Sequence, residues 1–208
     1  MTKDPVDTLT PMAVMVLALL REGDMHPYEM VRLLRSRGGD RLLSITNGTL
    51  YHTVSRLEKS GLLAEIGTDR EGNRPERTTY TLTDAGRDTV MAWVRRELPR
   101  IDRETDFRLA LAEAHNLERA DVIVLLRERR GALEDAHETH RDGLRAAREA
   151  AVPAQVLVEI EREEVLLGAE LHWLDTLLAR LDGDDLPWGP SAFPDSDRYL
   201  AQRKAAQQ

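Results

Sequence analysis

The chain has 208 residues, a formal net charge of −8 and no cysteine. Without cysteine it can hold no disulfide, no thiolate zinc site and no cysteine nucleophile, and its length suffices for one or two domains. The acidity lies in one half, because residues 1–100 carry a net charge of +1 and residues 101–208 a net charge of −9. A basic face in the first half can therefore still bind DNA, since phosphate contacts depend on local charge.

Two short helices are predicted at the start of the chain. Thr10 and Pro11 supply the cap and first-turn proline of an apolar helix that ends near Gly23. Pro27 begins a second helix with one apolar face, and the glycine pair at 38–39 ends it. We expect the first helix to be largely buried.

A third helix is predicted from its cap at Thr46 to Gly61. Leu50, Val54 and Leu57 share one face at a spacing of i, i+4, i+7. The opposite face carries small and polar residues: Gly48, Thr49, His52, Ser55, Arg56 and Lys59. A helix with one apolar face and one face of donors suits the DNA major groove, although a polar outer face is also common on any soluble helix.

A β-hairpin and a fourth helix are predicted next. The segments 62–67 and 77–83 have strand-like sequences and flank a turn rich in glycine, asparagine and proline. Thr83 caps a helix that continues to about Leu98, and Pro99 ends it. In a winged helix-turn-helix such a hairpin lies beside the DNA backbone or minor groove, where the arginines of the hairpin contact phosphate.

Helices are predicted throughout residues 105–182. A short helix covers about 105–116, a long one about 118–150, and a last one follows Pro153. The last helix has apolar residues at mostly alternating steps of three and four: Ile160, Leu167, Leu171, Leu174, Leu178 and Leu181. A 30-residue helix is roughly 45 Å long, so we expect part of its apolar surface to face another chain.

Together these elements predict a mainly α protein in three parts. Residues 1–100 form an N-terminal winged helix-turn-helix of three helices, a β-hairpin wing and a fourth helix. Residues 101–182 form an all-α dimerisation domain, and residues 183–208 form a proline-containing tail. The predicted DNA contacts are Asn47, Thr49, Tyr51, His52, Ser55, Arg56, Lys59, Arg70, Arg74 and Arg77. We expect Arg56 to read a base edge and Arg74 to contact phosphate.

Four motifs in residues 9–100 resemble those of the PadR family of bacterial transcriptional regulators. They are Gly48-Thr49-Leu50-Tyr51, Leu57-Glu58-Lys59-Ser60-Gly61-Leu62, Arg74-Pro75, and Tyr80-Thr81-Leu82-Thr83-Asp84-Ala85-Gly86. The sequence departs from the family pattern at Pro27, where many members have glycine, and at Glu76, which would repel phosphate from the wing. The second half resembles the longer branch of the family, whose C-terminal helices dimerise.

The resemblance implies a homodimer and, in some members, an aromatic or drug-like effector. Trp93 lies in the region where those members bind effectors, and Ile101 and Phe107 offer further apolar lining, although tryptophans in helices are most often core residues. The predicted dimer contacts are Leu167, Leu171, Leu174 and Leu178. We expect a two-fold dimer on an inverted repeat of double-stranded DNA, acting as a repressor that an effector releases.

Other functions have weaker support in the sequence. His137 and His140 with Glu134 could be drawn as a metal site, but the HExH spacing differs from HExxH and an exposed helix explains these residues better. No catalytic grouping and no cofactor motif is present, so we expect neither an enzyme nor a cofactor. An alternative that the sequence leaves open is a helical protein–protein interaction adaptor whose winged domain binds protein rather than DNA. Lacking a signal peptide pattern and a long apolar run, the chain is expected in the cytoplasm with no membrane partner.

Overall fold

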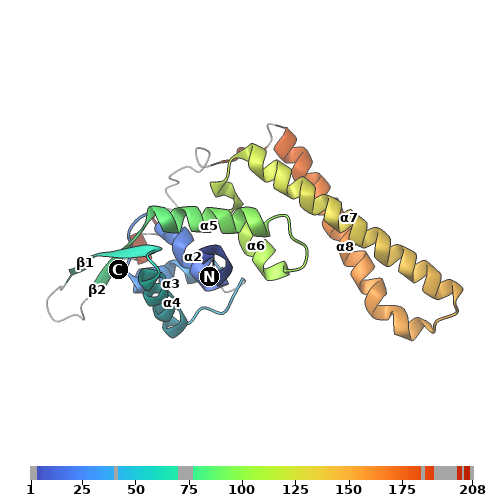
Figure 1. The fold of residues 1–208 in the computed structure, drawn as a ribbon, viewed down its shortest axis with the longest axis horizontal. Coiled ribbons are helices and arrows are strands. Elements are labelled where there is room, and N and C mark those ends of the chain that lie inside the picture. The colour runs from blue at the N-terminus through green and yellow to red at the C-terminus, as the bar shows by residue number, and fades with distance from the viewer. Residues whose placement is uncertain are drawn as a thin grey trace. The chain divides into compact units, whose positions relative to one another are not determined.

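The computed structural model describes residues 4–39, 42–69, 77–183, 186–189, 201–202 and 204–206 (Figure 1). The chain divides into two compact units. The first comprises residues 1–95, 108–113 and 194–208, and the second comprises residues 96–107 and 114–193. Within the described residues, no helix combines the length and apolar composition needed to cross a membrane.

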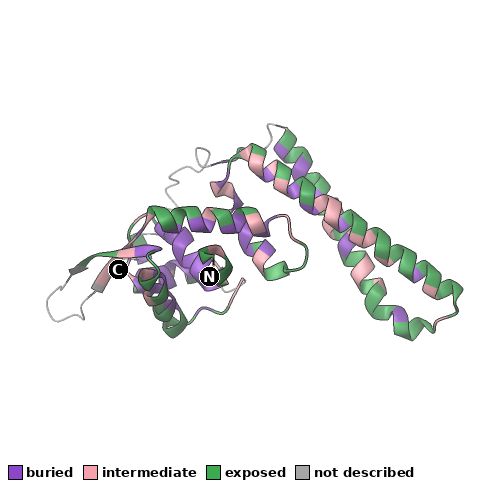
Figure 2. Ribbon diagram, viewed as in Figure 1, coloured by how far each residue is buried: buried purple, intermediate pink, exposed green. Residues whose placement is uncertain are grey.

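The first unit is built around helix α2 (Pro11–Leu20). Thr10 caps this helix, accepting a hydrogen bond from the Ala13 amide at 3.3 Å, and Pro11 occupies its first turn. Every residue from Met12 to Leu20 is buried, and Figure 2 shows α2 largely in the colour of buried residues. An apolar sequence on all sides of a helix requires neighbours on all sides, and α2 contacts two further helices and the β-hairpin. The expectation of a largely buried first helix is confirmed.

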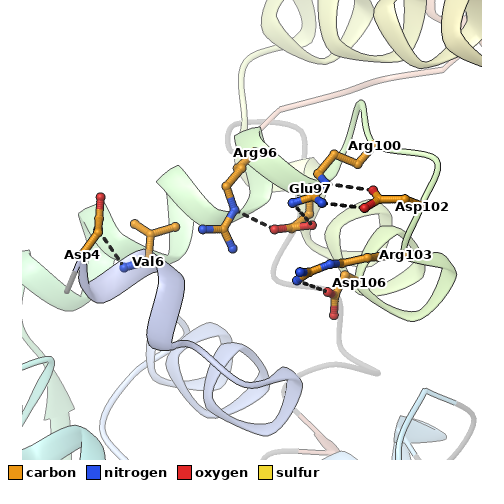
Figure 3. A network of polar contacts seen from close by, with 8 residues as sticks. All are labelled: Asp4, Val6, Arg96, Glu97, Arg100, Asp102, Arg103 and Asp106. Atoms are coloured by element: carbon orange, nitrogen blue, oxygen red, sulfur yellow. Dashed lines mark hydrogen bonds and ion pairs between the residues drawn. The ribbon is translucent and has the colours of Figure 1, made fainter.

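Along the chain, one short helix precedes α2 and two helices follow it before the β-hairpin. A short α1 (Pro5–Thr8), which the sequence reasoning did not predict, precedes it and is capped by Asp4, whose side chain accepts from the Val6 amide at 2.9 Å (Figure 3). Helices α3 (Pro27–Ser36) and α4 (Asn47–Lys59) follow. Both are amphipathic and pack on α2 with their apolar faces.

The hairpin consists of β1 (Leu63–Asp69) and β2 (Arg77–Leu82), which pair antiparallel from Leu63 opposite Leu82. Met25 adds one further pair to this sheet, because its backbone exchanges two hydrogen bonds of 3.1 Å with Tyr80. The backbone just before α3 is thereby attached to the wing.

Helix α5 (Asp84–Glu97) packs closely on the junction between α4 and the hairpin. The Thr83 hydroxyl donates to the Gly61 carbonyl at 2.8 Å and accepts from the Gly86 amide at 3.0 Å. A Cβ atom on Gly86 would lie 1.9 Å from the Leu62 carbonyl oxygen. This approach of helix to backbone is possible only because residue 86 has no side chain.

A chain of ion pairs accompanies the end of α5 (Figure 3). Arg96 donates to the fully buried Glu97 at 2.6 Å, and Arg100 donates to Asp102 at 2.6 Å and 2.9 Å. The hydrogen bond from Arg100 holds the pKa of the Asp102 carboxyl below its usual value. Arg103 then pairs with Asp106 in α6 (Glu104–Glu113) at 3.4 Å. These contacts lie on either side of Pro99, which prevents α5 from continuing.

The second unit contains the 3-10 turn η2 (Ala114–Asn116) and a hairpin of two long helices, α7 (Arg119–Glu149) and α8 (Ala154–Asp182), which lie side by side in Figure 1. Ion pairs between the helices are consistent with an antiparallel arrangement: Arg127–Asp182 at 2.9 Å, Arg130–Asp175 at 2.5 Å and Arg148–Glu161 at 2.8 Å. The seam between the helices buries Val122, Leu126, Leu133, Leu144, Leu157, Leu167, Leu174, Leu178 and Leu181. Each long helix is therefore the main apolar partner of the other.

Candidate nucleic-acid interface

Helix α4 is held in one orientation by its cap and its buried face. The Thr46 hydroxyl accepts a hydrogen bond from the Thr49 amide at 3.1 Å, which satisfies one of the open donors at the helix start. Leu50, Val54 and Leu57 are at most 2% exposed. Because these three residues lie along one stripe, the opposite side of the helix must face away from the core.

The outward side of α4 carries the residues predicted to contact DNA. Asn47, Thr49, Tyr51, His52, Arg56 and Lys59 are exposed, and Ser55 is half-buried. A Cβ atom added at Gly48 would meet no atom within 4 Å, so folding does not require a glycine there. The open first turn instead allows another molecule to approach the backbone amides closely.

Arg56 lies on the flank of this surface. Its Nη2 donates to the Thr10 hydroxyl at 3.1 Å, so the guanidinium lies beside the start of α2. An arginine has five donors, and the remaining ones stay able to contact a base or a phosphate. At about 100° per residue, His52 and Lys59 lie nearer than Arg56 to the middle of the outward face.

The wing residues are described only in part. Arg70, Arg74 and Glu76 lie outside the described residues, and Arg77 is described by its backbone position at the start of β2. The strands place the hairpin directly after α4, as the sequence predicted. The roles of the three arginines stay predictions.

The residues predicted to line an effector site differ in exposure. Trp93 is 1% exposed and Phe107 is 6% exposed, whereas Ile101 is 38% exposed. The Phe107 ring meets Trp173 edge-on, with ring centroids 6.4 Å apart, and Arg129 Cζ lies 3.4 Å from the Phe107 centroid. Trp93 is thus a core residue, and a ring could stack on it only after the core had opened. The partners of Phe107 were missed because Arg129 and Trp173 are far from it in sequence.

The leucines predicted to hold the dimer together are largely covered within one chain. Leu167, Leu174 and Leu178 are at most 9% exposed in the seam with α7, and Leu171 is half-buried. The expectation that a monomer would leave this stripe exposed was wrong, because the periodicity of a helix does not specify its partner. A different side of α8 is apolar and open, at Val158, Val165, Leu166 and Trp173, which are 41% to 64% exposed.

The two histidines of α7 have partners within the second unit. His137 Nε2 lies 3.1 Å from a Glu164 carboxylate oxygen of α8. His140 Nδ1 lies 2.8 Å from the Ala136 carbonyl oxygen, one turn earlier in the same helix. In the part of the chain that the structure describes, no group of three or more potential ligands could hold a metal ion. The pair with Glu164 explains His137 as a contact across the helical hairpin.

Helices α2, α3 and α4, the β-hairpin and α5, with α4 presenting a polar face, form a winged helix-turn-helix fold. Residues 16–92, which lie in the winged-helix part of the chain, match the Transcriptional regulator PadR-like family.

One characterised relative spans most of the chain. The Negative transcriptional regulator PadR of Bacillus subtilis (strain 168) is 25% identical over 181 residues, which cover 81% of this chain and 96% of the relative.

Two solved structures of Bacillus subtilis PadR are also similar. The complex with operator DNA is 18% identical, covers 83% of this chain and 99% of the other, and has a TM-score of 0.41. The complex with p-coumaric acid is 20% identical, covers 88% and 100% of the two chains, and has a TM-score of 0.36. These scores are too low for positions in the chains to be equated.

Proposed function

We propose that this protein is a sequence-specific DNA-binding transcriptional regulator that represses its target genes. The observation that carries the proposal is the outward face of α4, where six predicted contact residues are exposed. The match of residues 16–92 to a family of transcriptional regulators supports it. The relative that spans most of the chain is named as a negative regulator, which supports repression.

His52, Lys59 and Arg56 are proposed to reach base edges in the major groove, with Asn47, Thr49, Tyr51 and Ser55 as further contacts. Arginine and lysine are the usual readers of guanine, and small polar side chains adapt to either strand. Arg56 can additionally hold a phosphate near the start of α2, because its bond to Thr10 brings it there. The wing arginines Arg70, Arg74 and Arg77 are proposed to bind the DNA backbone.

The test is a binding site selected from random oligonucleotides, followed by arginine and lysine variants. Arg56→Ala and Lys59→Ala should each cost roughly 1–3 kcal/mol on the selected site and reduce discrimination against random duplex. Arg87→Ala is the matched control, since Arg87 is an exposed arginine on α5. If both reader variants keep the ratio of specific to random binding, α4 does not read sequence.

A salt titration separates this function from that of a protein-binding adaptor. DNA binding that releases counterions weakens steeply as salt rises, whereas an adaptor has no such affinity for duplex. Absence of any salt-sensitive binding to random duplex would favour the adaptor.

The regulator is proposed to act as a two-fold dimer on an inverted repeat. Two recognition helices must enter successive major grooves roughly 34 Å apart, which a dimer provides. The open apolar side of α8, which we call the α8 stripe (Val158, Val165, Leu166 and Trp173), is the proposed contact. The α8 stripe takes the place of Leu167, Leu174 and Leu178 as the proposed dimer contact, because these leucines are already buried within one chain.

The remaining assignments belong to the same proposal. Residues 1–100 bind DNA, residues 101–182 dimerise and residues 183–208 form a tail, in a cytoplasmic protein without catalytic activity. A small aromatic effector is proposed to release the DNA. Of the three residues predicted to line its site, Ile101 is the exposed one, so direct stacking on Trp93 is not part of the proposal.

A further inference from the structure

A cavity of about 290 Å³ lies in the first unit, against the flank of α4. Three elements enclose it: α4, the start of α3 and strand β2. Its lining includes Tyr28, Tyr51, Tyr80, Glu58, Ser55 and His26. Its volume is at the lower limit of small-molecule sites, so it suits a small ligand.

The walls of this cavity are unusually rich in tyrosine for this chain. Aromatic residues make up 4% of the sequence, yet three of its four tyrosines line this one cavity. Tyr28 and Tyr51 are 48% and 49% exposed, so their rings are open to a ligand. Tyr80 is fixed by its backbone pairing with Met25. Three ring faces from three separate elements can surround one small group.

Charged groups of both signs lie near these rings, and the carboxylate in the cavity lining is that of Glu58. Glu58 lines the cavity, and burial together with the charges of Glu58 and Glu65 raises the pKa of Tyr80. The Tyr80 hydroxyl therefore stays protonated at neutral pH. Tyr28 already interacts with a cation, since Arg32 Cζ lies 5.8 Å from its ring centroid. The ring imidazole of His26 is engaged by Thr78 and Thr79, with its Nδ1 3.1 Å from the Thr78 carbonyl oxygen.

Tyrosine faces beside a carboxylate are the surroundings that favour an ammonium group. An anion would be repelled by Glu58, and a neutral ligand would gain at most a hydrogen bond from it, without the attraction between opposite charges. We propose that this cavity, which we call the tyrosine cavity, binds a small organic cation, and that the bound cation competes with DNA. The competition rests on the proposed function, because Tyr51 and Ser55 belong both to the cavity and to the DNA-binding face.

The binding step is tested on the full chain without DNA. Choline and its uncharged analogue 3,3-dimethylbutan-1-ol have nearly the same shape, so their difference isolates the charge. The NMR signals of the 13C-labelled tyrosine rings should shift to saturation as choline is added. The affinity for choline obtained from this titration should be about tenfold higher than the affinity for the alcohol. Equal affinities, or no saturable shift with choline, would overturn the cation site.

A pair of glutamate variants locates the charge. Glu58→Gln should weaken choline binding by about tenfold, because it removes the carboxylate and keeps the side-chain shape. Glu65→Gln is the matched control, since Glu65 also acts on Tyr80 but does not line the cavity. Circular dichroism of both variants verifies that they fold. Equal weakening by the two variants would mean a general charge effect and would overturn the assignment.

The coupling to DNA is measured separately. Choline chloride should lower affinity for the selected DNA site more than the same concentration of sodium chloride does, and Glu58→Gln should abolish that difference. If choline binds but the two salts act alike on DNA, the competition is disproved. If the protein bound no DNA at all, the proposed function would fail while the tyrosine experiment still decided the cation site.

Discussion

Helices α4 and α8 bury one face each and differ in what they leave outside. The exposed face of α4 consists mainly of small, polar and basic residues around His52 and Lys59, with the ring of Tyr51 beside them. The exposed face of α8 includes the α8 stripe, which is apolar. Each helix packs into the protein through its buried stripe. The composition of its exposed face therefore indicates which kind of molecule that face could bind. Basic and polar groups suit a nucleic acid, whereas an open apolar stripe suits another protein surface.

The two units also differ in how they hold their helices. In the first unit α2 is buried on all sides and Gly86 allows α5 to reach the backbone of Leu62. In the second unit a single seam joins α7 to α8, supported by ion pairs between the helices. We expect the first unit to be more sensitive to added volume, and the second to lost polar and apolar contacts.

The largest effect is expected from Gly86→Ala. The new methyl group would lie 1.9 Å from the Leu62 carbonyl oxygen and 2.8 Å from Leu82 Cδ1, so the backbone must move. We expect the first unit to lose about 3 kcal/mol of unfolding free energy. Amide hydrogen exchange in α2 measures this, with α7 as an internal reference. Equal destabilisation of α2 and α7 would contradict the division into units.

Breaking the α8 stripe should affect association rather than folding. Leu166→Asp places a charge on a surface proposed to be buried in the dimer and should cost about 2 kcal/mol of association free energy. Val124→Asp is the control, because Val124 is 64% exposed on α7. Light scattering at several concentrations measures the dimer. A monomeric parent protein, or equal loss in both variants, would remove the stripe as the contact.

Arg129 tests the polar contacts of the second unit. It is 2% exposed, donates to the Glu170 carboxylate through Nε at 3.0 Å, and also donates to the Arg100 carbonyl. Because Glu170 is partly exposed, Arg129→Met should cost about 1.5 kcal/mol rather than the full cost of a buried pair. Arg127→Met removes the exposed pair with Asp182 and should cost about 0.5 kcal/mol. Urea denaturation followed by far-UV circular dichroism measures the unfolding free energy of both variants. Equal losses would show that the burial of the arginine does not determine how much its ion pair contributes to stability.

The smallest effect is expected from Gly48→Ala, and it should separate stability from binding. An alanine there meets open space and favours helix, so the unfolding free energy should rise by about 0.5 kcal/mol. DNA affinity should fall by about 1 kcal/mol, because the methyl group obstructs approach to the first-turn amides. Denaturation and DNA titration of the same variant measure both quantities. A stabilised variant with unchanged DNA affinity would show that the DNA does not approach Gly48.

Much of the first unit could be predicted from short-range signals. Thr10, Thr46 and Thr83 were identified as caps, and each accepts a hydrogen bond from a nearby backbone amide in the structure. The outward face of α4 followed from the positions of Leu50, Val54 and Leu57. The pairing of Met25 with Tyr80 was not predicted, because one residue of extended chain leaves no periodic pattern.

The sequence by itself determined where α2 and α4 begin and which side of α4 is polar, because caps and helical periodicity act within a few residues. Only the tertiary structure decided what the leucines of α8 bury against, why Arg56 lies beside Thr10 and how three tyrosines come to line one cavity. These contacts join residues far apart in the chain. Their geometry depends on how whole helices and strands pack, which no local pattern specifies.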